Sequence, residues 1–317
     1  MRRMLGTLMV IATVTLVVAG CGGSAKKTAA GSGDTTAASS AGGDVSSVLS
    51  AVKTNTASQG PTKIAVDATF TIDGTPSGQF KSFLSKPIHV TVDGVTSGSD
   101  ANATVSLTVS DKPIKFGVIS VAGKSFIQLD GKWFDSAAVS SAGSSLGTGL
   151  PKVSTSGLDL SKVTSSIGDP SKLFKDGATV SDDDVEGIKT DHVSGTLDAQ
   201  GIIGAIESIS KATGKPYTAP TAADQKKLED ALNGAKVDVW VGKDDHLVHK
   251  LAVDGTIKLD TPQQGVGSVG IKLSVTSVPK DGVKIEAPSD VRPTAELQAA
   301  ALNLIGPFMG DLSAAQG

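Results

Sequence analysis

The sequence predicts an α+β fold in which an antiparallel sheet carries helices on one side. Segments with apolar residues at every second position recur along the chain, as in IAVDATFTI at 64–72. This period of two is typical of half-buried strands. Helix-capping residues at Asp44, Asp198 and Thr221 precede segments with helical periodicity, so the helices are few and an antiparallel sheet forms the main layer.

The first half of the folded part predicts one helix and then a meander. Asp44 caps a helix that ends at Gly60-Pro61 and has Val45, Val48, Leu49 and Val52 on one face. Strands follow in IAVDATFTI, HVTV, ATVSLTV, IKFGVISV and SFIQL. Asp-Gly pairs at 73–74, 93–94 and 130–131 are expected to form hairpin turns between them.

A Ser/Gly-rich stretch at 136–168 predicts a long connection. It contains GSSLG at 143–147, a formal match to the nucleophile elbow of a hydrolase with Ser145 at its centre. That elbow needs a strand before it and a helix after it. The surrounding sequence predicts neither, so the match is interpreted as accidental and no catalytic residue is assigned.

The second half predicts short elements followed by three strands. Asp169-Pro170 opens a short helix, and VEGIKTDHVSGTLD at 185–198 predicts a strand. Asp198 caps a helix whose inner face is Ile202, Ile206 and Ile209, and Thr221 opens a capping box for the next helix. The strands are KVDVWVG, HLVHKLAVDGTIKLD and VGIKLSVTSV. Thr294 then caps a C-terminal helix with an apolar stripe of Leu297, Ala301, Leu304, Ile305 and Phe308.

The N-terminus predicts a signal peptide over residues 1–20, with a basic tip and a short apolar run. Val18-Ala19-Gly20-Cys21 fits the bacterial lipobox, so Cys21 is expected to be acylated. An ordinary secretory signal before a free cysteine is the alternative. Residues 21–43 are mostly Gly, Ser, Ala and Thr, which predicts a flexible tether with a reach of about 25 Å. The protein is therefore expected on the outer face of the cell membrane, held by lipid.

Composition excludes several classes of function. The chain has 29 basic and 32 acidic residues; without Arg2 and Arg3 of the signal peptide the net charge is about −5, which does not suit nucleic acid. Cys21 is the only cysteine, so no disulfide is expected in the exported domain. His246 and His249 lie three apart on an expected strand, hence on opposite faces. Asp182, Asp183 and Asp184 are interpreted as a solvated turn. No metal, cofactor or enzymatic activity is predicted.

Several segments together resemble the LppX/LprG type of actinobacterial lipid-binding lipoproteins, which is related in architecture to the LolA and LolB carriers. They are the lipobox at Cys21, FIQLDGKWFD at 126–135, DPSKLFKDGATVSDDDVEGIKTDHVSGTLD at 169–198 and VDVWVGKDDHLVHKLAVDG at 237–255. The resemblance implies a LolA-like lipid-binding domain over 44–286. Residues 287–317 form a C-terminal extension beyond it.

The resemblance also implies a fold and a function. The fold is a strongly curved antiparallel sheet, a half-barrel, with helices packed on its concave side around a hydrophobic cavity. The function is binding and carrying acyl chains of lipids or glycolipids, with an unidentified export partner. The expected lining is aliphatic and aromatic: Phe70, Phe116, Val118, Phe126, Leu129, Ile202, Ile206 and Ile209. The alternative is a tethered adaptor or scaffold whose filled core holds no ligand and which binds a protein partner, because alternation alone does not distinguish a cavity from a filled core.

Overall fold

The structure is a computed structural model of the chain, and its described residues are 44–52, 60–74, 86–136, 170–212, 217, 219–232, 234–261, 266–297, 299–301 and 303. The expected signal peptide, Cys21, the tether and the Ser145 motif lie outside these residues. Leu304, Ile305 and Phe308 of the expected C-terminal stripe lie outside them as well.

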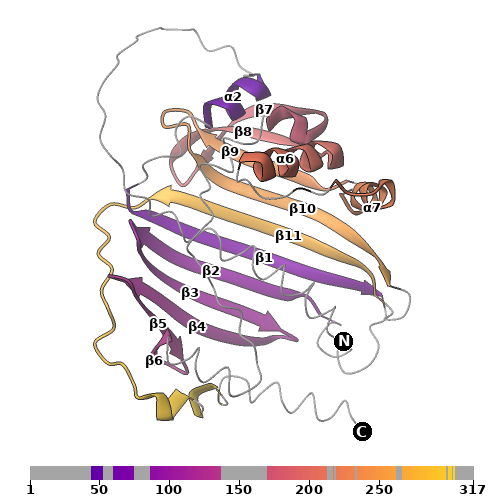
Figure 1. The fold of residues 1–317 in the computed structure, drawn as a ribbon. Coiled ribbons are helices and arrows are strands. Elements are labelled where there is room, and N and C mark those ends of the chain that lie inside the picture. The colour runs from indigo at the N-terminus through magenta and orange to yellow at the C-terminus, as the bar shows by residue number, and fades with distance from the viewer. Residues whose placement is uncertain are drawn as a thin grey trace.

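One antiparallel sheet of eleven strands dominates the described part of the chain (Figure 1). Its spatial order is β6-β5-β4-β3-β2-β1-β11-β10-β9-β8-β7, so two meanders join where β1 pairs with β11. The strands are β1 (Thr62–Gly74), β2 (Ile88–Ser97), β3 (Asp100–Val109), β4 (Lys112–Val121), β5 (Lys124–Leu129), β6 (Lys132–Asp135), β7 (Phe174–Val185), β8 (Ile188–Leu197), β9 (Lys236–Gly242), β10 (Val248–Thr261) and β11 (Val266–Pro279).

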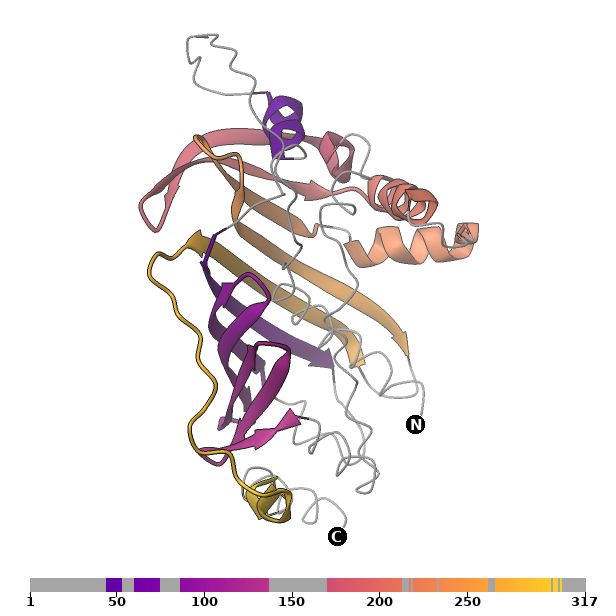
Figure 2. The ribbon, with the colours of Figure 1, turned by 60° about the vertical axis from the view of Figure 1, so that its left-hand side comes forward.

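The helices lie near one end of the sheet (Figures 1 and 2). They are α2 (Val45–Val52), α6 (Ala199–Ala212) and α7 (Ala222–Leu232), with the short 3₁₀ turn η3 (Pro170–Leu173). A second 3₁₀ turn, η5 (Thr294–Glu296), lies at the opposite end, beside β5 and β6. The caps at Asp198 and Thr221 are confirmed: the Gly201 N–H donates to Asp198 Oδ2 at 2.7 Å, and the Asp224 N–H donates to Thr221 Oγ1 at 3.2 Å. No helix of the described residues is both long enough and apolar enough to cross a bilayer.

The Asp-Gly pairs differ in what they do. Asp130 and Gly131 form the β5–β6 turn with φ of 50° and 74°, as predicted. Asp93 and Gly94 instead lie inside β2, so that turn prediction was wrong. A Cβ at Gly94 would lie 2.8 Å from the carbonyl oxygen of Asn102 on β3. This glycine therefore permits the close approach of two strands.

The strand predicted at 185–198 is confirmed as β8 but begins later, and a preceding strand, β7, was not predicted. Val185 ends β7, Glu186 and Gly187 turn the chain at φ of 50° and 88°, and Ile188 begins β8. Asp182, Asp183 and Asp184 belong to β7 and are not a turn, because each pairs with a residue of β8. β7 is an edge strand, and charged side chains are common where an edge faces solvent.

The expectation of a large antiparallel sheet with few helices is confirmed for the described residues. The sheet is open, with β6 and β7 at its two ends, and it curves between them (Figure 2). Closure into a half-barrel with helices on the concave side and a cavity beneath them stays a prediction.

Candidate functional site: the apolar face of the sheet

Strand register places an unbroken row of apolar side chains across the sheet. Nine neighbouring strands from β7 to β4 each contribute one residue to it, and each residue pairs with the next. The row is Val180, Val193, Val239, Leu251, Val275, Val66, Val92, Val105 and Phe116. Strands lie about 4.8 Å apart, so the row is roughly 38 Å wide.

A second row runs beside the first, two residues along each strand. It consists of Gly195, Val237, Val253, Leu273, Ala68, Val90, Leu107 and Ile114. Side chains two apart on a strand share a face, so both rows belong to one surface, which we call the apolar face. The opposite surface, the polar face, carries residues such as His192, Lys250, Thr276, Asp93 and Thr104, which also follow one another across the strands.

Helix α2 packs on the apolar face at its β7–β10 end. Leu49 of α2 is buried in one cluster with Phe174, Val193 and Val237, and strand residues such as Leu251 pack around them. The amphipathic pattern of the helix accounts for this contact, since Val45, Val48 and Leu49 fall on the side that meets the sheet. This end of the face is therefore an ordinary filled core.

A second cluster lies on the apolar face at the β4–β6 end. Leu129 and Phe134 are buried together with Leu297 and Ala300 of the C-terminal segment, and Phe116 and Ile127 pack against them. The chain thus covers both ends of the face with different segments.

The central strands β11, β1, β2 and β3 contribute no residue to either cluster. Ile64, Val66 and Ala68 of β1 are buried. Phe70, Val92, Val105 and Leu107 on the same face are only partly buried. The middle of the apolar face therefore combines a buried β1 with half-covered neighbours.

The structure brings together four of the expected lining residues. Phe70, Phe116, Val118 and Leu129 all lie on the apolar face. Phe126 lies on the polar face, because it pairs with Ile119 and is buried with Ile119 and Ile285. Phe126 and Leu129 are three apart on a strand, and this spacing alone sends them to opposite faces. The same rule, applied to the sequence, would have added Val92 and Val105.

The helical members of the expected lining are on α6. Ile202 is partly buried there, and the side chains of Ile206 and Ile209 lie outside the described residues. Gly201 brings α6 against η3, since a Cβ at this position would overlap the carbonyl oxygen of Lys172. The contribution of α6 to a binding site stays a prediction.

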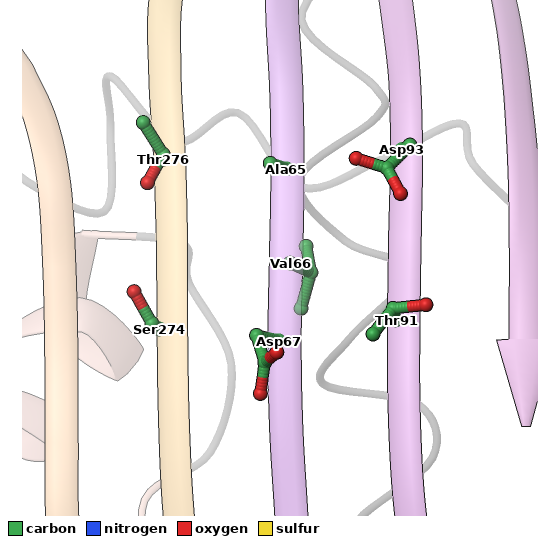
Figure 3. Close-up of a pocket in the computed structure, with 7 residues that line it drawn as sticks. All are labelled: Ala65, Val66, Asp67, Thr91, Asp93, Ser274 and Thr276. Carbon is green, nitrogen blue, oxygen red and sulfur yellow. The ribbon is translucent and has the colours of Figure 1, made fainter. Parts of the chain in front are cut away.

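The polar face has a shallow depression of about 190 Å³ on β11, β1 and β2 (Figure 3). It forms where the small Ala65 lies between larger side chains, and it is lined by Ala65, Val66, Asp67, Thr91, Asp93, Ser274 and Thr276. Five of the seven lining residues carry a carboxylate or hydroxyl group, and burying these groups against an alkyl chain would be costly. Within the described residues no group of three or more His, Cys, Asp or Glu side chains is placed to hold a metal ion.

Three histidines have partners on or beside the polar face, and the first is His89, whose Nε2 lies 3.2 Å from both carboxylate oxygens of Asp67. His192 stacks on Trp240 with ring centroids 4.3 Å apart, and its Nε2 lies 2.9 Å from Asp238 Oδ1. His249 is buried between Ser277 O and the Asp245 carboxylate. His246 lies in the turn before β10, with φ of 54°, rather than on the strand where it was expected.

Comparisons with known proteins find likenesses among solved structures. No family model matches the chain, and no curated protein matches it. Among solved structures it is similar to the crystal structure of the Mycobacterium tuberculosis lipoprotein LppX, with 14% identity and a TM-score of 0.36. The likeness covers 76% of this chain and 98% of LppX. LppX belongs to the type of lipoprotein that the sequence resembles.

Proposed function

We propose that this protein is an envelope lipoprotein that binds the acyl chains of lipids on the central part of its apolar face and carries or shields them. The observation that supports the proposal is the pair of apolar rows that crosses β11, β1, β2 and β3 between the two filled ends. Beside the buried β1, the side chains that β11, β2 and β3 contribute to these rows are only partly buried, and a contiguous apolar surface that the chain covers incompletely is a candidate binding site.

The chemistry of the face suits alkyl chains better than any polar ligand. Its central positions are valine, leucine, isoleucine, alanine and phenylalanine. Burying one methylene contributes about 0.8 kcal/mol, so affinity would grow with chain length. The face offers no charged side chain along either row, so little selectivity for a headgroup is expected from it.

Anchoring by Cys21 is the other half of the proposal. Two acyl chains on Cys21 would hold the protein at the membrane, and the segment to residue 43 would let the sheet reach lipids in that membrane. Its support is the lipobox and the composition of the tether.

The test is a search for bound lipid in natively produced protein. An organic extract analysed by mass spectrometry should contain lipid in a stoichiometric amount. Val105→Asp should reduce both this lipid and the uptake of a fluorescent fatty acid by on the order of tenfold or more, because it places a charge between Val92 and Phe116.

Ser106→Asp is the matched control. Ser106 neighbours Val105 on β3 but lies on the polar face opposite Thr91 and Lys115, so this variant should retain lipid. If Val105→Asp fails to fold, Val92→Thr provides a second test, because it keeps the shape of the side chain but adds a hydroxyl group to the apolar face. It should also reduce lipid binding. A parent protein that carries no lipid and takes up no probe would instead support the adaptor with a filled core.

A further inference from the structure

The C-terminal segment wraps around one edge of the sheet. After β11 ends at Pro279, Val283 and Ile285 pack against Ile119 and Phe126 on the polar face. The chain then passes β6, and Leu297 and Ala300 reach the apolar face. Figures 1 and 2 both show this segment descending beside the sheet and ending in helical turns next to β5 and β6.

The first part of this segment, residues 280–293, is firmly attached. Ile285 is buried, and the Arg292 N–H donates to the carbonyl oxygen of Trp133 at 2.7 Å. Val291 also forms a parallel bridge with Trp133 on β6. This isolated pairing covers the outer edge of β6 at Trp133.

The second part, residues 294–303, is attached differently. Its apolar contacts come from Leu297 and Ala300. Its polar contacts are surface pairs: Lys132 Nζ lies 3.0 Å from Glu296 Oε2, and Asn303 Nδ2 lies 2.9 Å from Asp130 Oδ2. The hydrogen bond from Lys132 lowers the pKa of Glu296, yet exposed pairs of this kind contribute little stability. We call the described residues of this part, 294–297, 299–301 and 303, the C-terminal plug.

The plug lies on the continuation of the proposed binding surface. Phe116 on β4 is the last residue of the nine-strand row. It packs with Ile127, Leu129 and Phe134 in the cluster beneath the plug. Phe134 has no exposed surface and Leu129 is 8% exposed. Without the plug, these side chains would extend the central apolar face to the edge of the sheet.

We infer that the C-terminal plug is a displaceable cover over an acyl-chain subsite formed by Phe116, Ile127, Leu129 and Phe134. The inference rests on the proposed function, because it assigns part of the same face to the same class of ligand. Pro293 lacks a backbone donor, so the pairing with Trp133 ends at Arg292, and displacement of the plug requires no loss of the bonds to Trp133. An acyl chain and the plug compete for the subsite.

Locking the plug tests the inference. In the mature chain with Cys21→Ser, the pair Asp130→Cys and Asn303→Cys would be joined by a short thiol-specific crosslinker that a reductant cleaves. The control pair is Lys63→Cys and Glu186→Cys, whose parent side chains also form a surface pair, at 2.9 Å, away from the plug. Truncation after Pro293 does the opposite of the crosslink, because it removes the plug and uncovers the subsite. The readout is the rate and extent of uptake of a fluorescent fatty acid.

The locked plug should slow uptake on the order of tenfold, since the open state becomes scarce. Reductant should restore the rate, the control pair should bind like the parent, and truncation should bind faster and take up more probe. Equal uptake by the locked, control and truncated proteins would overturn the inference while leaving the proposed function intact. Absence of uptake by all of them, the parent included, would overturn the proposed function. If the truncated protein is unfolded, the comparison of uptake by the crosslinked plug pair and the crosslinked control pair still tests the inference.

Discussion

At the scale of single residues, Trp240 shows how the polar face is held together. Its indole stacks on His192, its N–H donates to Asp183 Oδ2 at 2.7 Å, and Lys250 Nζ lies 4.3 Å from the ring centroid. Lys250 and His192 flank Trp240 on the two neighbouring strands. One aromatic residue thus links four strands, from β7 to β10.

The hydrogen bond from Trp240 lowers the pKa of Asp183 below its ordinary value of 3.8, and a bond from the Asp184 N–H acts in the same direction. The ionised form is therefore favoured in the folded state. Its stabilising effect is complete above a pH of about 4 and is lost as the pH falls through the lowered pKa.

Asp183→Asn should remove this pH dependence. The difference in melting temperature between parent and variant should be largest above a pH of about 4 and should shrink toward a pH of about 2. Trp240→Phe, which lacks the N–H donor, should lose the same pH-dependent part. A difference that stays constant across this range would show that the bond to Trp240 does not favour the ionised carboxylate.

Some residue roles could be predicted from the sequence and others could not. The side chains of Phe70, Phe116 and Val118 followed from alternation, because a strand places every second residue on one face. Phe126 was assigned to the wrong face of the strand SFIQL. Adjacent apolar residues in this strand made either face plausible for Phe126. Its spacing of three residues from Leu129, however, already placed the two side chains on opposite faces. The role of Gly94 needed the neighbouring strand, since its reason is a contact with Asn102.

At the scale of elements, η3 and α6 show how closely the helices meet. Gly201 lies where α6 approaches the backbone of η3 at Lys172. A Cβ at Gly204, one turn later on the same helix, would have no neighbouring atom within 4 Å and would face open space. The two glycines therefore form a natural pair for comparison.

Gly201→Ala should destabilise the protein by about 1–3 kcal/mol, because a methyl group would push α6 away from a backbone carbonyl that cannot turn aside. Gly204→Ala should stabilise it by up to about 1 kcal/mol through higher helix propensity. Urea denaturation of both variants measures these differences. Equal effects of the two substitutions would mean that α6 does not pack on η3 as described.

Helices were predicted better than turns. Asp198 and Thr221 begin their helices through local hydrogen bonds that depend on a few adjacent residues. The turn at Glu186 and Gly187 was missed, and with it the boundary between β7 and β8, because Val185 and Ile188 on either side continue the apolar pattern. Edge strand β7 was not predicted except for its last residue, Val185, since it has one partner strand and its acidic end does not alternate.

At the scale of the whole molecule, the sheet was predictable and its covering was not. Alternation identifies an apolar face but does not say which segment covers it. Helix α2 covers one end and the C-terminal segment covers the other, and both assignments depend on contacts between residues more than a hundred positions apart.

The expected location of the protein gives a further prediction. Cys21→Ala should move the protein from the membrane fraction to the soluble fraction, because acylation of this residue is the proposed anchor and Cys21 is the only cysteine. Cell fractionation followed by immunoblotting measures the shift. Ser24→Ala, in the adjoining tether, should leave the distribution unchanged, and full retention of Cys21→Ala in the membrane would refute anchoring by this residue.

The pairing of β1 with β11 constrains the order of folding. Thr62 pairs with Pro279, whereas every other ladder of the described sheet joins strands consecutive along the chain. During synthesis, strands β1 to β6 can pair with their neighbours as hairpins. One edge of β1 stays unpaired until β11 has been synthesised. Such long-range pairing is slow to form, and an unpaired edge invites association with other chains. Folding of this protein should thus end with the pairing of β1 and β11. Until these two strands pair, the chain depends most on protection by chaperones.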